Sequence, residues 1–217
     1  MVIELGANPW ILIGLMLTEL FLIFIPAFIA SKIEATSFKD ELMFMGFKKN
    51  TDPFLKIFTK ILAGILIGFI FYFISGYITF FFRNLIIENI FGSEFIKKGQ
   101  KGSISTNPIK PSLIQVIIII ILQFIIVALC EESFFRGFVI KKIEKKAKYF
   151  YSTLISSLCF AIYHTPPFIV PITTIIVYFG YFFTFGILLS ITFRIFNYSL
   201  IPCIIAHGLF NTLILIF

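Results

Sequence analysis

The sequence predicts an all-α integral membrane protein, built as one polytopic helix bundle. Of its 217 residues, 59% are apolar and only 13% are charged, whereas a soluble domain usually has about 45–50% and about 25%. The apolar residues form blocks of about 20, the length that a helix needs to cross a bilayer. These observations exclude a soluble single domain, a disordered chain and a nucleic-acid-binding module.

The formal charge of +7 comes mostly from Lys and Arg in the polar stretches between the apolar blocks. Membrane proteins place basic residues there, where they fix the orientation of the chain. We therefore expect a lipid bilayer and no nucleic acid as partner. The three cysteines lie in apolar segments without C-x-x-C spacing, so we expect buried, reduced thiols; they are Cys130, Cys159 and Cys203.

Six apolar segments predict the membrane spans of a single domain over residues 1–217. They are residues 9–30, 57–82, 113–130, 149–164, 172–193 and 200–217. The third stays apolar as far as residue 140, and the fourth is short. We expect six clear spans, with seven or eight if an amphipathic segment or a broken helix also inserts.

Two of the stretches between these spans are long and polar. Residues 31–56 mix lysines with Met and Phe, which predicts a loop with an interfacial amphipathic piece. Residues 83–112 carry lysines together with Gly and Pro, which predicts a surface loop. The densest basic cluster, Lys141 to Lys148, predicts a cytoplasmic end. That orientation puts residues 83–112 outside, despite their lysines.

A few ionisable side chains fall inside the predicted spans, and both histidines of the chain are among them. They are Glu19, Glu131, Glu132, Arg136, His164 and His207, with Asn211 as a polar companion. A charge at the centre of a membrane helix costs about 2.5–3.5 kcal/mol. We therefore expect most of these groups to gather around one hydrated cavity. Glu19 is equally well explained as a functional carboxylate or as a hydrogen-bonded group facing the bundle.

Helical spacing predicts which of these side chains share a face. Glu132 and Arg136 are four residues apart and can form an intrahelical ion pair. Glu131 is rotated by about 100° from Glu132 and faces elsewhere. The same four-residue spacing relates two further pairs, Phe160 with His164 and His207 with Asn211.

This set of groups suits hydrolysis of an amide by an activated water. A carboxylate can act as general base, and His164 can align or deprotonate the same water. His207 and Asn211 can donate hydrogen bonds to the developing oxyanion, worth about 3–4 kcal/mol per donor. Three alternatives remain open: residues that only tie helices together, a proton-relay transporter, and a metal site. The metal would be bound by Glu131, His164 and His207, although the chain has no H-E-x-x-H sequence.

Three motifs resemble those of one protein family. E-E-S-F-F-R at 131–136, F-A-I-Y-H at 160–164 and H-G-L-F-N at 207–211 look like its E-E-x-x-x-R, F-x-x-x-H and H-x-x-x-N/D motifs. The family is that of the CAAX-protease and bacteriocin-processing proteins, which are intramembrane glutamate endopeptidases and include the type II CAAX prenyl endopeptidase. All three motifs occur in the family's order, and each lies on an apolar segment.

The resemblance implies a catalytic core over residues 113–217 and a role for each motif residue. Glu131 would be the general base, His164 its partner, and His207 with Asn211 the oxyanion site. Glu132, Arg136 and Phe160 would support them, and no metal would be needed. The family commonly has eight membrane helices, whereas the sequence predicts only six clear spans.

The expected function is that of an intramembrane endopeptidase, and CAAX-type removal of the C-terminal tripeptide from a prenylated protein is the leading reaction. The active site would open towards the cytoplasm. A bacteriocin-processing or immunity-type protease, and a non-enzymatic transporter or scaffold, remain alternatives because a fold does not determine a substrate. Counting about 1.5 Å per residue from the basic cluster puts Glu131 about 15 Å deep and His164 about 24 Å deep. A tilted or broken helix is therefore needed to bring them together.

Overall fold

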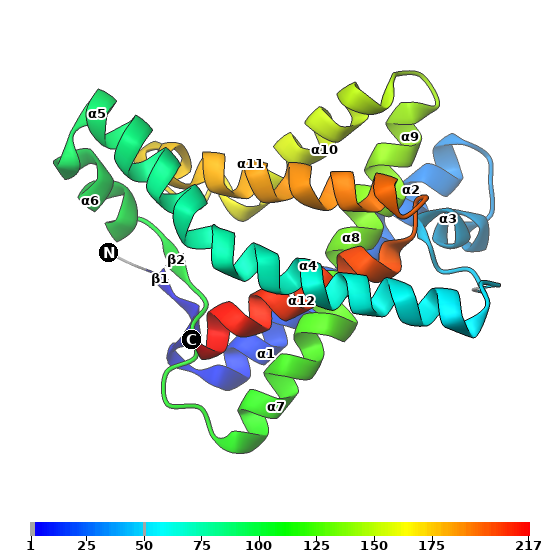
Figure 1. The fold of residues 1–217 in the computed structure, drawn as a ribbon, viewed down its shortest axis with the longest axis horizontal. Coiled ribbons are helices and arrows are strands. Elements are labelled where there is room, and N and C mark those ends of the chain that lie inside the picture. Colours follow the sequence, from blue (N-terminus) through cyan, green and yellow to red (C-terminus); the bar gives the residue numbers. More distant parts are fainter. Residues whose placement is uncertain (1–2, 50) are drawn as a thin grey trace.

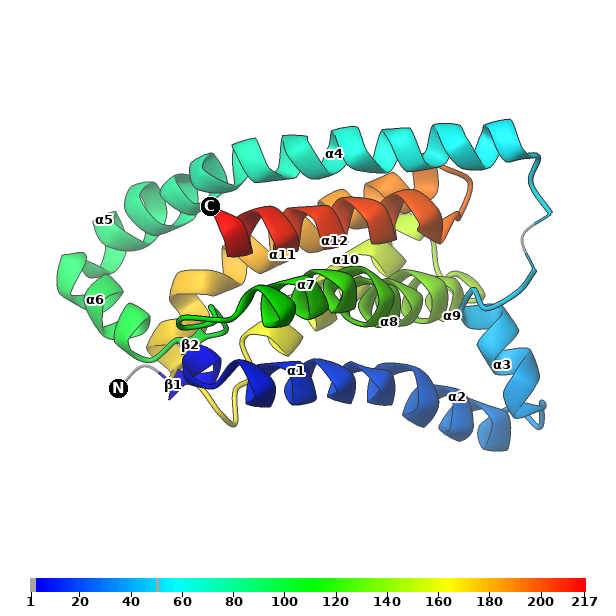
Figure 2. The same ribbon diagram turned by 90° about the horizontal axis from the view of Figure 1, so that it is seen from below.

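The computed structural model describes residues 3–49 and 51–217, and these form a layered bundle of helices (Figures 1 and 2). The predicted all-α class is confirmed. The α-helices are α1 (Pro9–Leu17), α2 (Phe21–Ile33), α3 (Phe38–Met45), α4 (Phe54–Phe80), α5 (Glu88–Phe91), α6 (Ser93–Lys101), α7 (Leu113–Leu122), α8 (Leu129–Glu132), α9 (Lys141–Glu144), α10 (Tyr149–His164), α11 (Ile172–Ile195) and α12 (Leu200–Ile216). Two short strands, β1 (Ile3–Glu4) and β2 (Ile104–Ser105), pair in parallel.

Several of these helices join end to end through turns of different pitch. A 3₁₀ turn, Thr18–Leu20, links α1 to α2, and a π-helical segment, Phe81–Ile87, links α4 to α5. Two further π-helical segments, Gln123–Ala128 and Ser133–Ile140, lie on either side of α8. The chain therefore runs as one helix from α7 to the end of α9.

Four helices of the described chain are long and apolar enough to cross a membrane. They are Pro9–Ile33, Phe54–Phe91, Leu113–Glu144 and Ile172–Ile195. The other two predicted spans are also helices, but α10 has 16 residues and α12 has 17. Many large apolar side chains on the outer faces are exposed, as expected where lipid is the solvent. The protein is an integral membrane protein.

The prediction of a surface loop over residues 83–112 is wrong for its first part. The second span continues as helix to Phe91, and α6 follows directly. Polar and apolar residues alternate in α6 with helical spacing, so one face packs on α11 while the lysines face outward. A Cβ at Gly99 would lie 2.7 Å from Val177 Cγ2, so only glycine permits this close packing. The amphipathic piece expected within residues 31–56 is α3.

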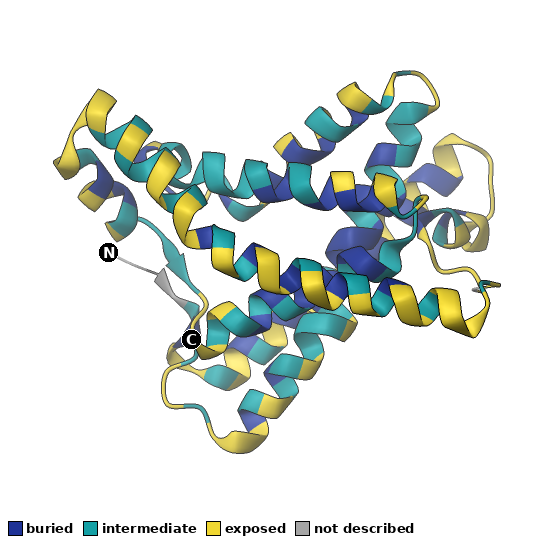
Figure 3. Ribbon diagram, in the orientation of Figure 1, coloured by how far each residue is buried: buried dark blue, intermediate teal, exposed yellow. Residues whose placement is uncertain are grey.

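The buried residues gather where α8, α12 and the middle of α11 meet (Figure 3). Figure 2 shows α4 on one side of the bundle, α1 and α2 on the other, and the α7–α9 helix between them. Phe71 of α4, Phe185 of α11 and Phe210 of α12 form an aromatic contact, with Phe185 stacked on Phe210 at 4.7 Å. These rings belong to the core cluster that also contains Phe135 and Phe160, the two rings against which Arg136 lies.

Candidate active site

The motif carboxylates lie on a short stretch of regular helix between two π-helical segments. Glu131 and Glu132 are in α8, which follows Gln123–Ala128 and precedes Ser133–Ile140. A π-helical turn accommodates an additional residue and so changes the direction in which the side chains beyond it point. Such turns occur often at functional sites. Here both carboxylates are directed into the bundle, and they are 3% and 0% exposed.

Glu132 joins three helices. Its Oε1 accepts hydrogen bonds from Arg136 Nη1 at 2.9 Å and from His207 Nδ1 at 2.8 Å. Arg136 is fully buried and also donates from Nη2 to the carbonyl oxygen of Gly186 at 3.0 Å. The predicted ion pair between Glu132 and Arg136 is therefore present, and it extends to α12 and α11.

Both histidines approach Glu131 from different helices. Glu131 Oε2 lies 3.6 Å from His164 Nε2 on α10 and 3.9 Å from His207 Nε2 on α12. These separations are longer than direct hydrogen bonds. The expected convergence of one carboxylate and both histidines is thus found in the structure. Because α10 runs at an angle to the α8–α9 helix (Figure 1), the difference in depth counted along the chain does not keep His164 away.

The hydrogen bonds of the two rings define where their protons lie. His164 Nδ1 is 3.0 Å from the carbonyl oxygen of Phe160, which only accepts, so Nδ1 carries a proton. His207 Nδ1 lies 2.8 Å from Glu132 Oε1, the oxygen that also accepts from Arg136, so we assign the donor role to this nitrogen as well. In each ring Nε2 is the nitrogen that faces Glu131. A neutral ring presents a lone pair there, and a charged ring presents a second N–H.

The Phe160 ring packs against three of the polar side chains. It lies 4.3 Å from the ring of His164, 6.0 Å from that of His207, and 4.8 Å from the Arg136 guanidinium carbon. The His164 ring is held from its other side by Phe182 at 4.6 Å. Aromatic packing therefore fixes the orientation of the imidazole.

Asn211 lies one turn beyond His207 on α12. Its Nδ2 donates to Gln123 Oε1 at 3.0 Å. An amide NH₂ has two donor hydrogens, so one of them remains for another acceptor. Gln123 belongs to the π-helical segment Gln123–Ala128 and is not among the site residues that the sequence predicts.

Glu19, for which the sequence predicts no specific partner, has a hydrogen-bond partner in the structure. The Tyr163 hydroxyl lies 2.6 and 2.7 Å from the two carboxylate oxygens of Glu19. Glu19 is in the 3₁₀ turn that interrupts the first span, and Tyr163 directly precedes His164. The first span is thereby tied to the end of α10 that carries the histidine. No sequence signal connects two residues 144 positions apart.

Metal binding was an alternative use of the same side chains. In the part of the chain that the structure describes, no group of three or more His, Cys, Asp or Glu side chains is placed to hold a metal ion. Glu131, His164 and His207 form a carboxylate flanked by two imidazoles.

The fold and these residues define a polytopic membrane protein with a cluster of carboxylate, guanidinium and imidazole groups inside the bundle. A family model, described as type II CAAX prenyl endopeptidase Rce1-like, matches residues 113–213, the segment that holds all three motifs. The predicted resemblance to the CAAX-protease family is therefore confirmed, and the match supports a CAAX-type membrane protease. Comparisons with curated proteins and with solved structures gave no match.

Proposed function

We propose that this protein is an intramembrane glutamate endopeptidase that cleaves a peptide bond with an activated water. One observation carries the proposal: Glu131 is buried inside the bundle with an imidazole nitrogen from each of two other helices within 4 Å of the same carboxylate oxygen. A water placed among these three groups can be held by all of them. The oxygen of Glu131 that faces the histidines makes no hydrogen bond to the described residues.

The proposed reaction begins when Glu131 takes a proton from the water and the resulting hydroxide adds to the scissile carbonyl carbon. His164 Nε2, with its lone pair towards the same water, aligns it for attack. The tetrahedral intermediate then collapses, the carbon–nitrogen bond breaks, and the proton held by Glu131 passes to the leaving amine. No covalent enzyme intermediate is formed, and no metal is required.

The oxyanion would be stabilised from α12. His207 can donate from Nε2 only when it also keeps its proton on Nδ1, so the donating form is an imidazolium. Glu132, which accepts from Nδ1 at 2.8 Å, balances that charge. Asn211 would donate the amide hydrogen that Gln123 does not use. Glu132 and Arg136 therefore act as positioning residues in this proposal, and Phe160 fixes both rings.

The substrate proposed is the C-terminal region of a prenylated protein, cleaved to release a tripeptide. The match to the Rce1-like family supports this choice. A bacteriocin-processing or immunity-type protease would use the same site on a peptide without a prenyl group. A comparison of prenylated and non-prenylated peptides separates these two uses.

The decisive experiment measures cleavage of a fluorogenic farnesylated CAAX peptide by the protein purified in detergent. We expect Glu131→Gln to reduce the rate by about 10²–10⁴-fold, the usual contribution of a general base. Glu94→Gln is a matched control, since Glu94 is an exposed carboxylate on α6. Full activity in metal-stripped, chelator-treated protein is expected. Cleavage that survives Glu131→Gln would refute the mechanism, and proton movement without cleavage would favour a transporter.

A further inference from the structure

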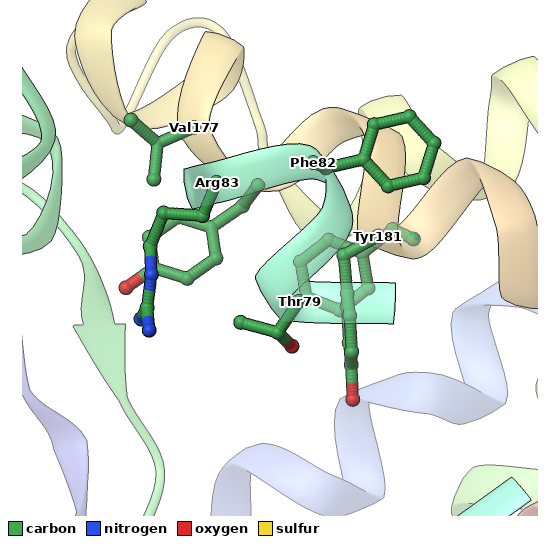
Figure 4. Close-up of a pocket in the computed structure, with 7 residues that line it drawn as sticks. Thr79, Phe82, Arg83, Val177 and Tyr181 are labelled. Atoms are coloured by element: carbon green, nitrogen blue, oxygen red, sulfur yellow. The ribbon is translucent and has the colours of Figure 1, made fainter. Parts of the chain in front are cut away.

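A small cavity lies beside the proposed active site, between the extension of α4 and the first half of α11 (Figure 4). Its volume is about 250 Å³, below the range of about 300–1,000 Å³ that is usual for drug-sized ligands. It can therefore take a single residue rather than a whole peptide. Aromatic rings form much of its wall, namely Tyr178, Tyr181 and Phe182.

Arg83 brings a positive charge to this cavity. Its Nε donates to the neighbouring Asn84 Oδ1 at 3.4 Å, and among the described residues no carboxylate forms an ion pair with it. Figure 4 shows the guanidinium and the Thr79 hydroxyl directed to the same side of the cavity. A guanidinium is planar and permanently charged, and two of its N–H groups can donate parallel hydrogen bonds to one carboxylate.

One aromatic ring, Phe182, contacts both the cavity and the proposed catalytic groups. Phe182 lines the cavity and stacks on His164 at 4.6 Å, and His164 Nε2 lies 3.6 Å from Glu131 Oε2. Three extended residues span about 10 Å, and the separations that link Glu131 to His164 and His164 to Phe182 are 3.6 and 4.6 Å.

We propose that this cavity binds the free C-terminal carboxylate of the substrate peptide, with Arg83 as its ligand. The aromatic wall would hold the apolar side chain of the last residue. This inference rests on the proposed endopeptidase function. It adds the orientation of the substrate, whose C-terminal end would lie in this cavity. The enzyme would then measure its cleavage point from the chain terminus and would not cut within a long polypeptide.

The test compares two farnesylated peptides that differ only at the terminus, one a free acid and the other an amide. We expect wild-type protein to cleave the acid peptide about tenfold faster or more, since hydrogen bonds to charged groups are stronger than those between neutral groups. Arg83→Gln should lower the cleavage rate of the acid peptide to that of the amide peptide and leave the cleavage rate of the amide peptide unchanged. Lys98→Gln, which removes an exposed positive charge from the neighbouring α6, should keep the preference.

Two results would overturn the carboxylate site: equal cleavage of acid and amide by wild type, or an equal loss on both peptides in Arg83→Gln. Binding of the same labelled peptides to Glu131→Gln protein separates this inference from the proposed function. If the acid peptide binds about tenfold more tightly and Arg83→Gln removes the difference, the carboxylate site at Arg83 is confirmed. This holds even when wild type cleaves neither peptide. Equal binding of acid and amide refutes the site, whatever the outcome for cleavage.

Discussion

Two ion-pair clusters lie along the same helix, Leu113–Glu144, and they differ mainly in their depth. The central cluster comprises Glu132, Arg136 and His207, with N···O distances of 2.8 and 2.9 Å. The rim cluster, at the end of the helix, comprises Lys142 and Lys145 with Glu34 and Glu41, with distances from 2.5 to 3.2 Å. By distance alone the two clusters would be judged equally strong.

Burial makes them unequal. Glu132 and Arg136 have no exposed side-chain surface. In the rim cluster Glu41 and Lys142 are 4% and 15% exposed, but Glu34 and Lys145 are 36% and 50% exposed. Surface ion pairs contribute little because water and salt screen them. Removal of one partner from a buried pair leaves an uncompensated charge in an apolar environment. The central cluster therefore holds α8, α11 and α12 in one arrangement, and the rim cluster only docks α3 and its preceding turn.

The largest effect is expected when the central cluster loses its carboxylate. Glu132→Ala leaves Arg136 buried without its counter-ion and His207 without the acceptor that orients it. We expect a loss of about 3–5 kcal/mol in the free energy of unfolding, measured by chemical denaturation in detergent. Glu34→Ala in the rim cluster should have a much smaller effect. Equal losses in both variants would show that burial does not distinguish the two clusters.

The next effect concerns catalysis rather than stability. Asn211→Ala removes one proposed oxyanion donor, and we expect kcat on the farnesylated peptide to fall by about 10²–10³-fold. Gln123→Ala removes only the side chain that orients Asn211, so its kcat should fall less. If Gln123→Ala costs as much as Asn211→Ala while KM is unchanged, Asn211 has a structural role and the oxyanion site must be reassigned.

Helical periodicity predicted the membrane fold and the local pairs, because these depend on residues close in sequence. Glu132 and Arg136 are one turn apart, and their ion pair followed directly from that spacing. The contact of Glu132 with His207 depends on how α8 and α12 pack, across 75 residues. The two π-helical segments around α8, and the helix in place of the expected loop after Arg83, arise from tertiary packing. A pattern based on a regular helix could not reveal them.

A smaller effect is expected at the contact that ties the first span to α10. Tyr163→Phe removes the hydroxyl that donates to Glu19, and a typical hydrogen bond contributes about 0.5–1.5 kcal/mol. We expect a modest fall in thermal stability and a several-fold loss of cleavage, because Tyr163 precedes His164. Tyr151→Phe is the control, since Tyr151 is exposed on the same helix. The same losses in both variants would remove any special role for Glu19.

The smallest effect belongs to the rim cluster and depends on pH. Hydrogen bonds from Lys142 and Lys145 hold the pKa of Glu34 below its ordinary value of 4.5. A lowered pKa in the folded state means that the pair stabilises the protein above the unfolded pKa and that this stabilisation disappears as the pH falls through the folded value. Glu34→Gln should therefore lower Tm slightly at neutral pH and leave it unchanged in strong acid.

Salt provides the comparison that separates the two clusters most directly. The difference in Tm between wild type and Glu34→Gln should shrink when salt is raised to about 1 M, where the screening length is only about 3 Å. The loss caused by Glu132→Ala should persist, because screening ions do not reach a side chain with no exposed surface. If the effect of Glu132→Ala depended on salt, water and ions would have to enter the central cluster. That would be expected if the active site opened widely to one side of the membrane.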